Sequence, residues 1–396
     1  MTVENIVEFN GACTVDAANA GGNTTLRGAT IGSGYVTILN VQNSTRTFTF
    51  GGSGAGGGHM WDFSGTIDFG TNNGSLRINN DNSTFNFGSS NATFNVGTGT
   101  AGLNQRNGGT TTHFGALIGS PTSTLSGRGG TGASGTTTYS IGGKNVDCTF
   151  AGSINNGSGT TAITKVGSAK LTLSGTGTHT GATSVESGTL QVDGNYGNSA
   201  VTVLSGAKLQ GNGSLGGTVD IQAGATLSPG ASIGVLGGIG SATLAGTTFI
   251  ELDKANSTND MFVATAGLNY GGDLIVTNLG GTLVVGDAFK IFDSTAYSGV
   301  FNTLTLPTIP AGAIWNLDNL AVDGTIRITG PTLNVVNNGT SLDFSWTGTY
   351  KLQSQTNNVT TGLGNNWFNY PGGGSSPVTV GINPANPAVF FRLSTP

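Results

Sequence analysis

Three copies of one short pattern decide the fold: VESGTLQV (residues 185–192), VLSGAKLQG (203–211) and IQAGATLSPG (221–230). Each copy has a short apolar-alternating run, a glycine corner and a second run that carries a leucine. The glycines are Gly188, Gly206 and Gly224, and the leucines are Leu190, Leu209 and Leu227. A segment of about eighteen residues cannot bury its own apolar side chains, so the copies must stack on one another. We therefore predict a β-solenoid, a right-handed β-helix in which each copy forms one coil.

The composition favours an all-β chain. Glycine accounts for 70 of the 396 residues, and only 8% of the residues are charged. Runs such as TFTF (47–50) place every second side chain on one face, which is the period of a strand. Apolar residues do not gather at helical spacing, and glycine interrupts nearly every window of ten residues. We expect strands joined by tight corners, with no long helix.

The chain divides into four regions that differ in sequence pattern. Residues 1–160 are strand-rich, irregular and rich in phenylalanine, and residues 161–245 hold the regular repeat. Residues 246–329 have longer apolar runs, so we expect wider coils there. Residues 330–396 contain a hairpin signal at Asn338-Gly339 and the aromatic residues Trp346, Trp367 and Tyr370, which include two of the four tryptophans of the chain. This last region predicts a small β-sandwich-like module with its own core.

Several phenylalanines are expected to pack inside the first region. Like residues on successive coils lie one above another, which favours an interior stack. An aromatic platform that binds sugars is the functional alternative. The residues concerned are Phe63, Phe69, Phe85, Phe87 and Phe94.

Charge and cysteine content limit the possible partners. The net charge is −5 with a pI near 5.0, and the basic residues are scattered, so we expect no nucleic-acid partner. No apolar run is long enough for a membrane-spanning helix. The start, MTVENIVEFNG, lacks the basic and apolar parts of a signal peptide, so we expect a mature segment or a fragment. Cys13 and Cys148 lie far apart, and we expect two small buried thiols.

Catalytic and metal-binding patterns are weak. A glycosidase needs two carboxylates that converge on one cleft, and three carboxylate pairs are candidates; we interpret all three as solvated corners. The pairs are Asp62 with Asp68, Asp253 with Asp260, and Asp318 with Asp323. His59, His113 and His179 lie in Gly- and Thr-rich corners without a neighbouring acid, so a catalytic triad is not expected. Metal-ligand spacing of Cys and His is missing, and we predict no metal, no cofactor and no catalytic residue.

The stretch TKVGSAKLTLSGTGTHTGATSVESGTLQVDG (164–194) resembles the autotransporter-associated β-strand repeat. The matching motifs are Lys165-Val166-Gly167, Leu171 to Gly175, Thr180-Gly181 and Ser187 to Leu190, whereas His179 replaces the usual tyrosine. The later order, including GATLSPGASIG (224–234) and the end PANPAVFFRLS (384–394), is similar to large secreted bacterial proteins, verrucomicrobial ones among them. The resemblance implies a passenger-type solenoid outside the cell or on its surface.

These observations predict an extracellular structural or adhesive protein. Stacked coils leave open strand edges at their ends, so we expect head-to-tail association of the chain with itself. Surface glycans are a possible further partner. The alternative is a β-helix that binds or cleaves polysaccharides, which needs a groove with clustered carboxylates and exposed aromatic residues.

Overall fold

Strands are the regular elements throughout the part of the chain that the computed structural model describes. It describes residues 1–17, 22–42, 46–51, 59–78, 87–105, 109–128, 135–358, 360, 362–386 and 388–395. The chain forms two compact units. Unit 1 comprises Met1–Asp253, Ser257–Leu279 and Ile291–Leu306, and unit 2 comprises Lys254–Asn256, Gly280–Lys290 and Pro307–Pro396.

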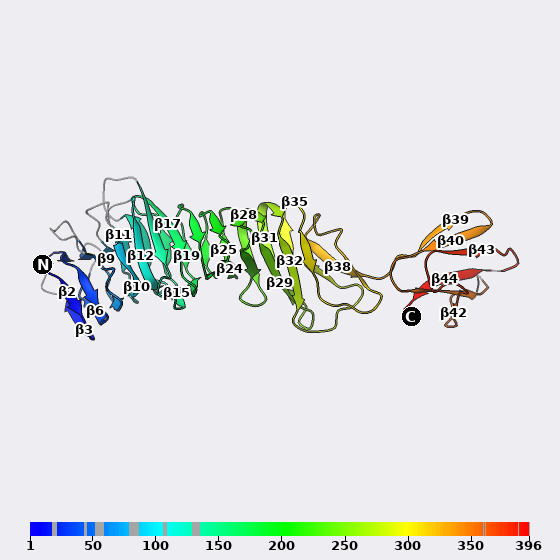
Figure 1. Ribbon diagram of the computed structural model, residues 1–396, viewed down its shortest axis with the longest axis horizontal. Coiled ribbons are helices and arrows are strands. Elements are labelled where there is room, and N and C mark those ends of the chain that lie inside the picture. Colours follow the sequence, from blue (N-terminus) through cyan, green and yellow to red (C-terminus); the bar gives the residue numbers. More distant parts are fainter. Residues whose placement is uncertain are drawn as a thin grey trace. The chain divides into compact units, whose positions relative to one another are not determined.

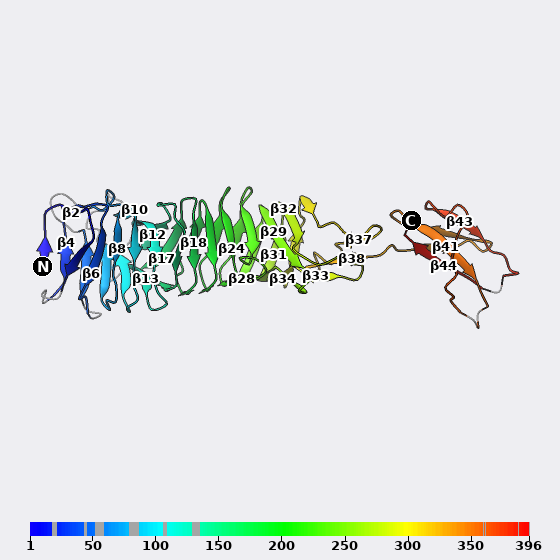
Figure 2. The ribbon, with the colours of Figure 1, turned by 90° about the horizontal axis from the view of Figure 1, so that it is seen from below.

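Unit 1 is a β-solenoid, as the repeat predicts. Within the described residues its strands form a 24-stranded sheet, a 9-stranded sheet and one separate pair, and all but one of the pairings between named strands are parallel. The 24-stranded sheet consists of two ladders, which join because β28 pairs with both β25 and β26. Successive coils extend the ladders, long strands such as β28 run through both, and the coils follow one another in chain order (Figures 1 and 2).

The first ladder contains β1 (Thr2–Val3), β4 (Thr24–Leu26), β7 (Thr47–Phe50), β9 (Ser75–Ile78), β11 (Gly102–Gln105), β13 (Thr124–Arg128), β16 (Ser153–Asn155), β19 (Thr176–Gly177), β22 (Asn195–Tyr196), β25 (Ser214–Leu215) and the start of β28 (Val235–Leu244). The second contains β3 (Cys13–Asp16), β6 (Tyr35–Leu39), β8 (Thr66–Asp68), β10 (Phe87–Asn95), β12 (Thr111–Ile118), β14 (Thr136–Ile141), β17 (Thr160–Lys165), β20 (Thr183–Val185), β23 (Val201–Val203), β26 (Val219–Ile221), the end of β28, the end of β31 (Met261–Tyr270) and β35 (Tyr297–Gly299). The start of β31 and β34 (Phe292–Ser294) continue the first ladder beyond the start of β28.

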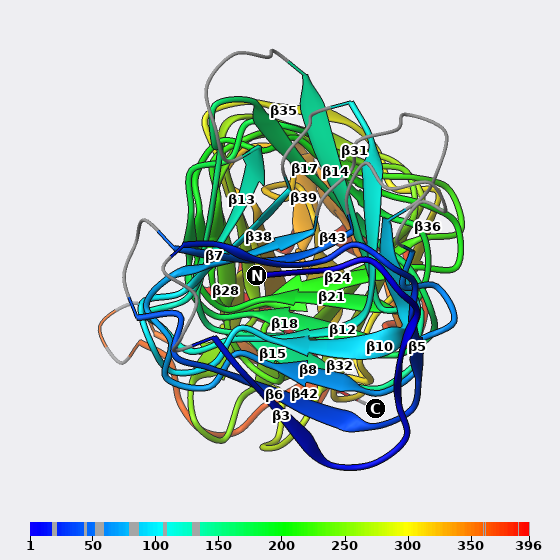
Figure 3. The ribbon, with the colours of Figure 1, turned by 90° about the vertical axis from the view of Figure 1, so that its left-hand side faces the viewer.

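The third ladder, the 9-stranded sheet, contains β15 (Cys148–Phe150), β18 (Lys170–Leu173), β21 (Thr189–Val192), β24 (Lys208–Gly211), β27 (Thr226–Pro229), β29 (Thr247–Asp253), β32 (Asp273–Asn278) and β36 (Thr303–Thr305), with β30 (Thr258–Asn259) paired to β29. The separate pair is β2 (Val7–Phe9) with β5 (Thr30–Gly32). Seen along the solenoid axis, the strands of successive coils overlie one another around a shared interior (Figure 3).

The repeat leucines form one interior column of the third ladder. Leu190 pairs with Leu209, and Leu209 pairs with Leu227, and each is at most 1% exposed. The repeat glycines lie at the corner that leads into these strands. All three have positive φ, +65° at Gly188, +82° at Gly206 and +81° at Gly224, a conformation that glycine adopts without strain.

Coil length changes along unit 1. Val201 pairs with Val219, 18 positions further on, whereas Leu274 pairs with Leu304, 30 positions further on. The extra residues lie between the ladder strands, so the coils after about residue 245 are longer, in line with their longer apolar runs. Earlier coils are also long, since Thr124 pairs with Ser153.

Aromatic side chains fill the interior of the first region. Phe63, Phe69 and Phe94 are fully buried and Phe87 is 7% exposed, which confirms core packing for these four; Phe85 lies outside the described residues. The ring of Phe94 packs on Phe114 at a centroid distance of 4.5 Å.

Unit 2 contains three small antiparallel sheets. One joins β33 (Ala288–Lys290), β38 (Thr325–Thr329) and β37 (Ile314–Asn316). The second joins β39 (Asn334–Asn337), β40 (Ser341–Ser345) and β43 (Val378–Gly381), and the third joins β42 (Phe368–Asn369), β41 (Lys351–Thr356) and β44 (Val389–Ser394).

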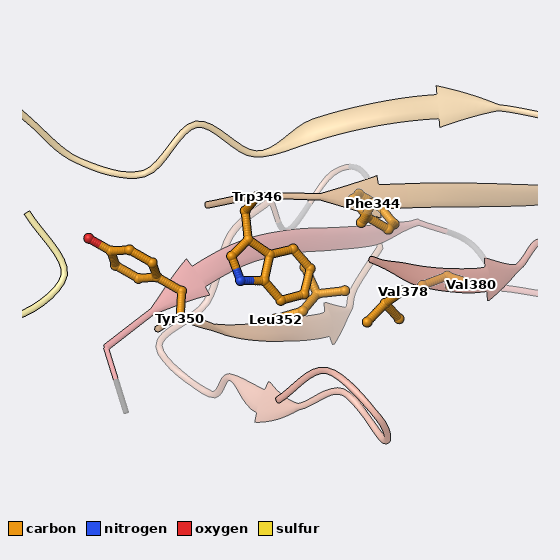
Figure 4. Packing of buried hydrophobic residues seen from close by; sticks show 6 residues of the cluster. All are labelled: Phe344, Trp346, Tyr350, Leu352, Val378 and Val380. Atoms are coloured by element: carbon orange, nitrogen blue, oxygen red, sulfur yellow. The ribbon is translucent and has the colours of Figure 1, made fainter. Parts of the chain in front are cut away.

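The second and third of these sheets share one core, which is the sandwich-like module predicted from the tryptophans. Its buried residues point toward one another between the strands (Figure 4). Phe344 packs on Phe391 across the two sheets at a centroid distance of 4.5 Å. The core residues are Phe344, Trp346, Tyr350, Leu352, Val378 and Val380.

Candidate functional site

A shallow groove of about 740 Å³ runs across several coils of unit 1, between the third ladder and the first. It follows a three-residue pattern in which a glycine stands between two other small or polar residues. Successive coils contribute Ala151-Gly152-Ser153, Ser174-Gly175-Thr176, Asp193-Gly194-Asn195 and Asn212-Gly213-Ser214. We call these twelve residues the X-Gly-Y groove. Pro121, Val235, Gly237 and Gly238 complete its lining.

Close approach between coils explains the glycines. A Cβ atom on Gly194 would lie 1.7 Å from the carbonyl oxygen of Gly175, and one on Gly175 would lie 2.0 Å from that of Gly152. On Gly213 the distance to the carbonyl oxygen of Gly194 would be 2.2 Å. Any side chain here would push the coils apart. The floor of the groove is therefore bare backbone, and its walls are the flanking side chains.

The backbone of the floor is already hydrogen-bonded between coils. The Asn195 amide donates to the Gly175 carbonyl at 3.0 Å, and the Ser214 amide donates to the Gly194 carbonyl at 2.9 Å. Peptide groups in this floor are consequently occupied, because parallel coils bond along the axis. A ligand in the groove must be recognised through side chains.

Several of those side chains have hydrogen-bonding capacity to spare. The Ser174 and Thr176 hydroxyls and the Asn195 Nδ2 atom have no partner among the described residues, whereas Asn195 Oδ1 accepts from the Ser214 hydroxyl at 2.9 Å. Asp193 is the charged residue of the lining, and its carboxylate accepts from the Asn212 amide and from the Gln191 side chain.

Lys165 is a buried cation at the corner that follows β17. It is 1% exposed, and its Nζ donates to the carbonyl oxygens of Val166, Gly167 and Ser187 at 2.7, 2.8 and 3.1 Å. Burial lowers the pKa of this amine to about 8, and the nearby Cys148 and Asp147 act in the opposite direction. The lysine of the Lys165-Val166-Gly167 motif thus holds two successive coils together through their main chains.

Asp260 contradicts the expectation that the carboxylate pairs are solvated. It is fully buried, and its carboxylate accepts from the backbone amides of Gly234 at 2.9 Å and Glu251 at 2.8 Å. Burial raises the pKa of this carboxyl to about 7, although the two amides lower it. Asp260 therefore connects the residue that precedes β28 to strand β29.

The other paired carboxylates lie at or near the surface. Asp62 and Asp318 are exposed, and Asp68, Asp253 and Asp323 are half-buried. Asp68 accepts from the Tyr35 hydroxyl, and Asp323 lies 3.9 Å from Arg327. The X-Gly-Y groove contains none of these six carboxylates.

The histidines match their expected corner positions only in part. His59 Nε2 lies 3.5 Å from Asp62 Oδ2, so an acid three residues away does accompany it, contrary to the sequence-based expectation. His113 is on strand β12 rather than in a corner. His179 is at a corner but is 2% exposed, and its Nε2 is 3.3 Å from the Thr183 hydroxyl. Burial lowers the pKa of both His113 and His179.

Both cysteines are free thiols. Cys148 is buried as expected, whereas Cys13 is only half-buried because its strand β3 belongs to the first coil. Burial raises the pKa of each thiol. Within the described ranges, no three His, Cys, Asp or Glu side chains cluster as a metal site would require. No helix in the described part of the chain has the length and apolar character needed to cross a membrane.

Sequence reasoning missed the X-Gly-Y groove, although its signal was present. The triplets AGS, SGT, DGN and NGS recur at the spacing of the coils, and each begins directly after a strand of the third ladder ends. Lys165 and Asp260 had weaker signals, since a charged residue near a corner is usually solvated. The repeat glycines Gly188, Gly206 and Gly224 lie at a different corner of the coil from the groove.

Comparison with known families identifies the repeat. Residues 163–192 match the family model described as Passenger-associated-transport-repeat. These residues include β18, β20 and β21, and they coincide with the stretch that resembles the autotransporter-associated repeat, which confirms that resemblance. No curated protein matches the chain.

Proposed function

Since residues 163–192 carry a passenger-type transport repeat, we propose that the chain is a structural part of a secreted or surface-displayed bacterial passenger, and that it associates with itself head to tail. The repeat supports the passenger-type architecture and export. The open first coil of unit 1 supports the self-association, which would use the same strand pairing that builds the solenoid.

The first coil is paired on one side only. Within the described residues β1 pairs with β4, β2 with β5, and β3 with β6, and none of the three has a second partner. Its inward-facing residues Val3, Val7, Phe9 and Val15 are only half-buried. Leu26 and Ile38, which pair with Val3 and Val15, are buried in the next coil, so a further layer would complete the burial of the first coil.

Main-chain groups of the first coil also face away from the solenoid. The Ala17 amide donates to the Leu39 carbonyl, and the Val7 amide donates to the Ala29 carbonyl. The main-chain groups of these odd-numbered residues therefore face the next coil. Because N–H and C=O directions alternate along a strand, those of Glu8 and Thr14 face outward. Such an edge adds a strand from another chain readily.

We infer that the strand added to this edge comes from a second copy of the chain, because the parallel ladders of each copy begin and end in strands that pair on one side only. The last strands, β35 and β36, each pair with a single strand in the described residues. A contact between the C-terminal part of one copy and the first coil of the next does not close, and it produces a filament. This role is mechanical and needs no catalytic residue. An adhesive role would follow from display along such a filament.

Proline at the edge tests this proposal. Thr14→Pro removes an outward N–H without removing a bond to β6, and Thr14→Val keeps the N–H and serves as the control. We expect wild type and Thr14→Val to show concentration-dependent growth in light scattering and linear particles in electron micrographs. Thr14→Pro should stay monomeric. Monomeric wild type at high concentration, or equal association of all three proteins, would refute the role of this edge.

A further inference from the structure

The X-Gly-Y groove has the chemistry of a binding site for a linear polymer. Its three rows run across the strands and therefore parallel to the solenoid axis, with successive rungs about 4.8 Å apart. Three of the four rungs offer hydrogen-bonding side chains on both sides of a glycine, and the Ala151-Gly152-Ser153 rung offers one on the serine side alone. The glycine-centred pattern repeats over about 15 Å, which suits a ligand that is itself a repeat.

The lining excludes several classes of ligand. It contains no lysine or arginine, and Asp193 gives it a negative charge, so polyanions such as nucleic acids and acidic glycans are disfavoured. A peptide strand would need free main-chain partners, and the amides of Asn195 and Ser214 are bonded between coils. Hydroxyl and amide side chains that both donate and accept remain available, at Ser174, Thr176 and Asn195.

We propose that this groove binds an extended neutral polysaccharide that lies parallel to the solenoid axis. The sugar hydroxyls bond to the hydroxyl and amide groups of the two walls, and the glycine floor lets the chain lie close to the backbone. This binding is separate from self-association, because the groove residues lie on the coils from Ala151 to Ser214 and not on the first coil. The lining lacks the clustered carboxylates and exposed aromatic residues expected of a polysaccharide-degrading β-helix, so the proposal is binding through hydrogen bonds, without cleavage, and it narrows a glycan partner to a neutral polymer.

The lack of aromatic residues in the groove lining predicts how the affinity for a polysaccharide depends on the length of the polysaccharide. No aromatic side chain lines the groove, so binding rests on hydrogen bonds repeated from rung to rung. Each such bond adds little on its own. Oligosaccharides shorter than the groove should therefore bind weakly, and affinity should rise steeply until the chain spans all four rungs.

Affinity electrophoresis of the full chain tests the proposal. The neutral probes are hydroxyethyl cellulose, galactomannan and dextran, and polygalacturonate is the acidic comparison. The groove variant combines Thr176→Ala, Asn195→Ala and Ser214→Ala. The control variant combines Ser184→Ala and Thr202→Ala, whose half-buried side chains lie on the second ladder. Circular dichroism melting establishes that both variants are folded.

We expect at least one neutral polysaccharide to retard the wild type and the control variant equally. The groove variant should bind that probe about tenfold more weakly or worse, since three hydrogen-bonding groups are lost. Retardation by none of the neutral probes, a preference for polygalacturonate, or unchanged binding by a folded groove variant would overturn the proposal. If the groove variant instead loses self-association in light scattering and retains the polysaccharide, the groove docks protein and the proposal fails.

Discussion

The buried Asp260 makes unit 1 sensitive to pH in a direction opposite to that of most carboxylates. Its pKa is about 7 in the folded chain and about 3.9 in an unfolded chain. The folded state therefore binds this proton more tightly. Its stabilising effect is complete below about pH 4, and it is lost as the pH rises to 7. The difference of about three pKa units corresponds to about 4 kcal/mol of unfolding free energy.

Asp260→Asn removes this titration while nearly preserving the shape of the side chain. The asparagine oxygen can accept from one of the two amides of Gly234 and Glu251, and its NH₂ group faces the other. At pH 4 we expect the variant to be less stable than wild type by about 1–3 kcal/mol, the cost of an unpaired buried donor. By pH 8 the wild type has lost its advantage, and the variant should be equal or more stable.

Urea unfolding, followed by circular dichroism at several pH values from 4 to 8, measures this difference. Subtracting the two proteins at each pH cancels the contribution of every other titrating group. The reasoning predicts that the stability of wild type relative to Asp260→Asn falls by about 4 kcal/mol across this range. A difference that is constant with pH, or that grows as pH rises, would refute it.

Three further substitutions test the packing of the two units. Gly194→Ala should lower the unfolding free energy of unit 1 by roughly 2–4 kcal/mol in urea unfolding, because its Cβ would lie 1.7 Å from a carbonyl oxygen of the preceding coil. The control is Gly197→Ala, whose Cβ would have its nearest contact at 4.0 Å, and it should change the unfolding free energy by less than about 0.5 kcal/mol. Lys165→Met should lower the unfolding free energy by about 3 kcal/mol at pH 7, because it leaves three main-chain carbonyls unpaired. Lys170 is more exposed, so Lys170→Met should leave the stability nearly unchanged in thermal melting. Equal effects of the two substitutions would contradict the role of Lys165 in joining two coils. Trp346→Ala should destabilise unit 2 by about 3–5 kcal/mol, seen as loss of its near-ultraviolet signal while the solenoid signal persists.

The stacking of the coils was predictable because one period governs the interior. Leucines that recur at the coil length must pair in register once the chain winds as a solenoid, as Leu190 and Leu209 do. Phenylalanines at alternate positions, such as Phe94, follow the same rule and are buried. Local alternation is enough to place such residues, since a strand has only two faces.

Polar residues at the corners were harder to place, because corner geometry decides which way they point. Lys165 turns inward because three main-chain carbonyls gather at its corner, and nothing in the spacing of Lys165-Val166-Gly167 shows that gathering. Asp260 is buried because two amides from distant segments meet it. The groove depends on the distance between neighbouring coils, which becomes visible only when Gly194 lies against Gly175.

The open first coil is the feature on which the proposed self-association rests. Sedimentation velocity of the full chain over a range of concentrations measures that association directly, with Thr14→Pro and Thr14→Val alongside. The account predicts that wild type and Thr14→Val form a growing series of larger species as concentration rises, while Thr14→Pro sediments as a single monomer. A single monomer for wild type at every concentration, or the same series for Thr14→Pro, would contradict it.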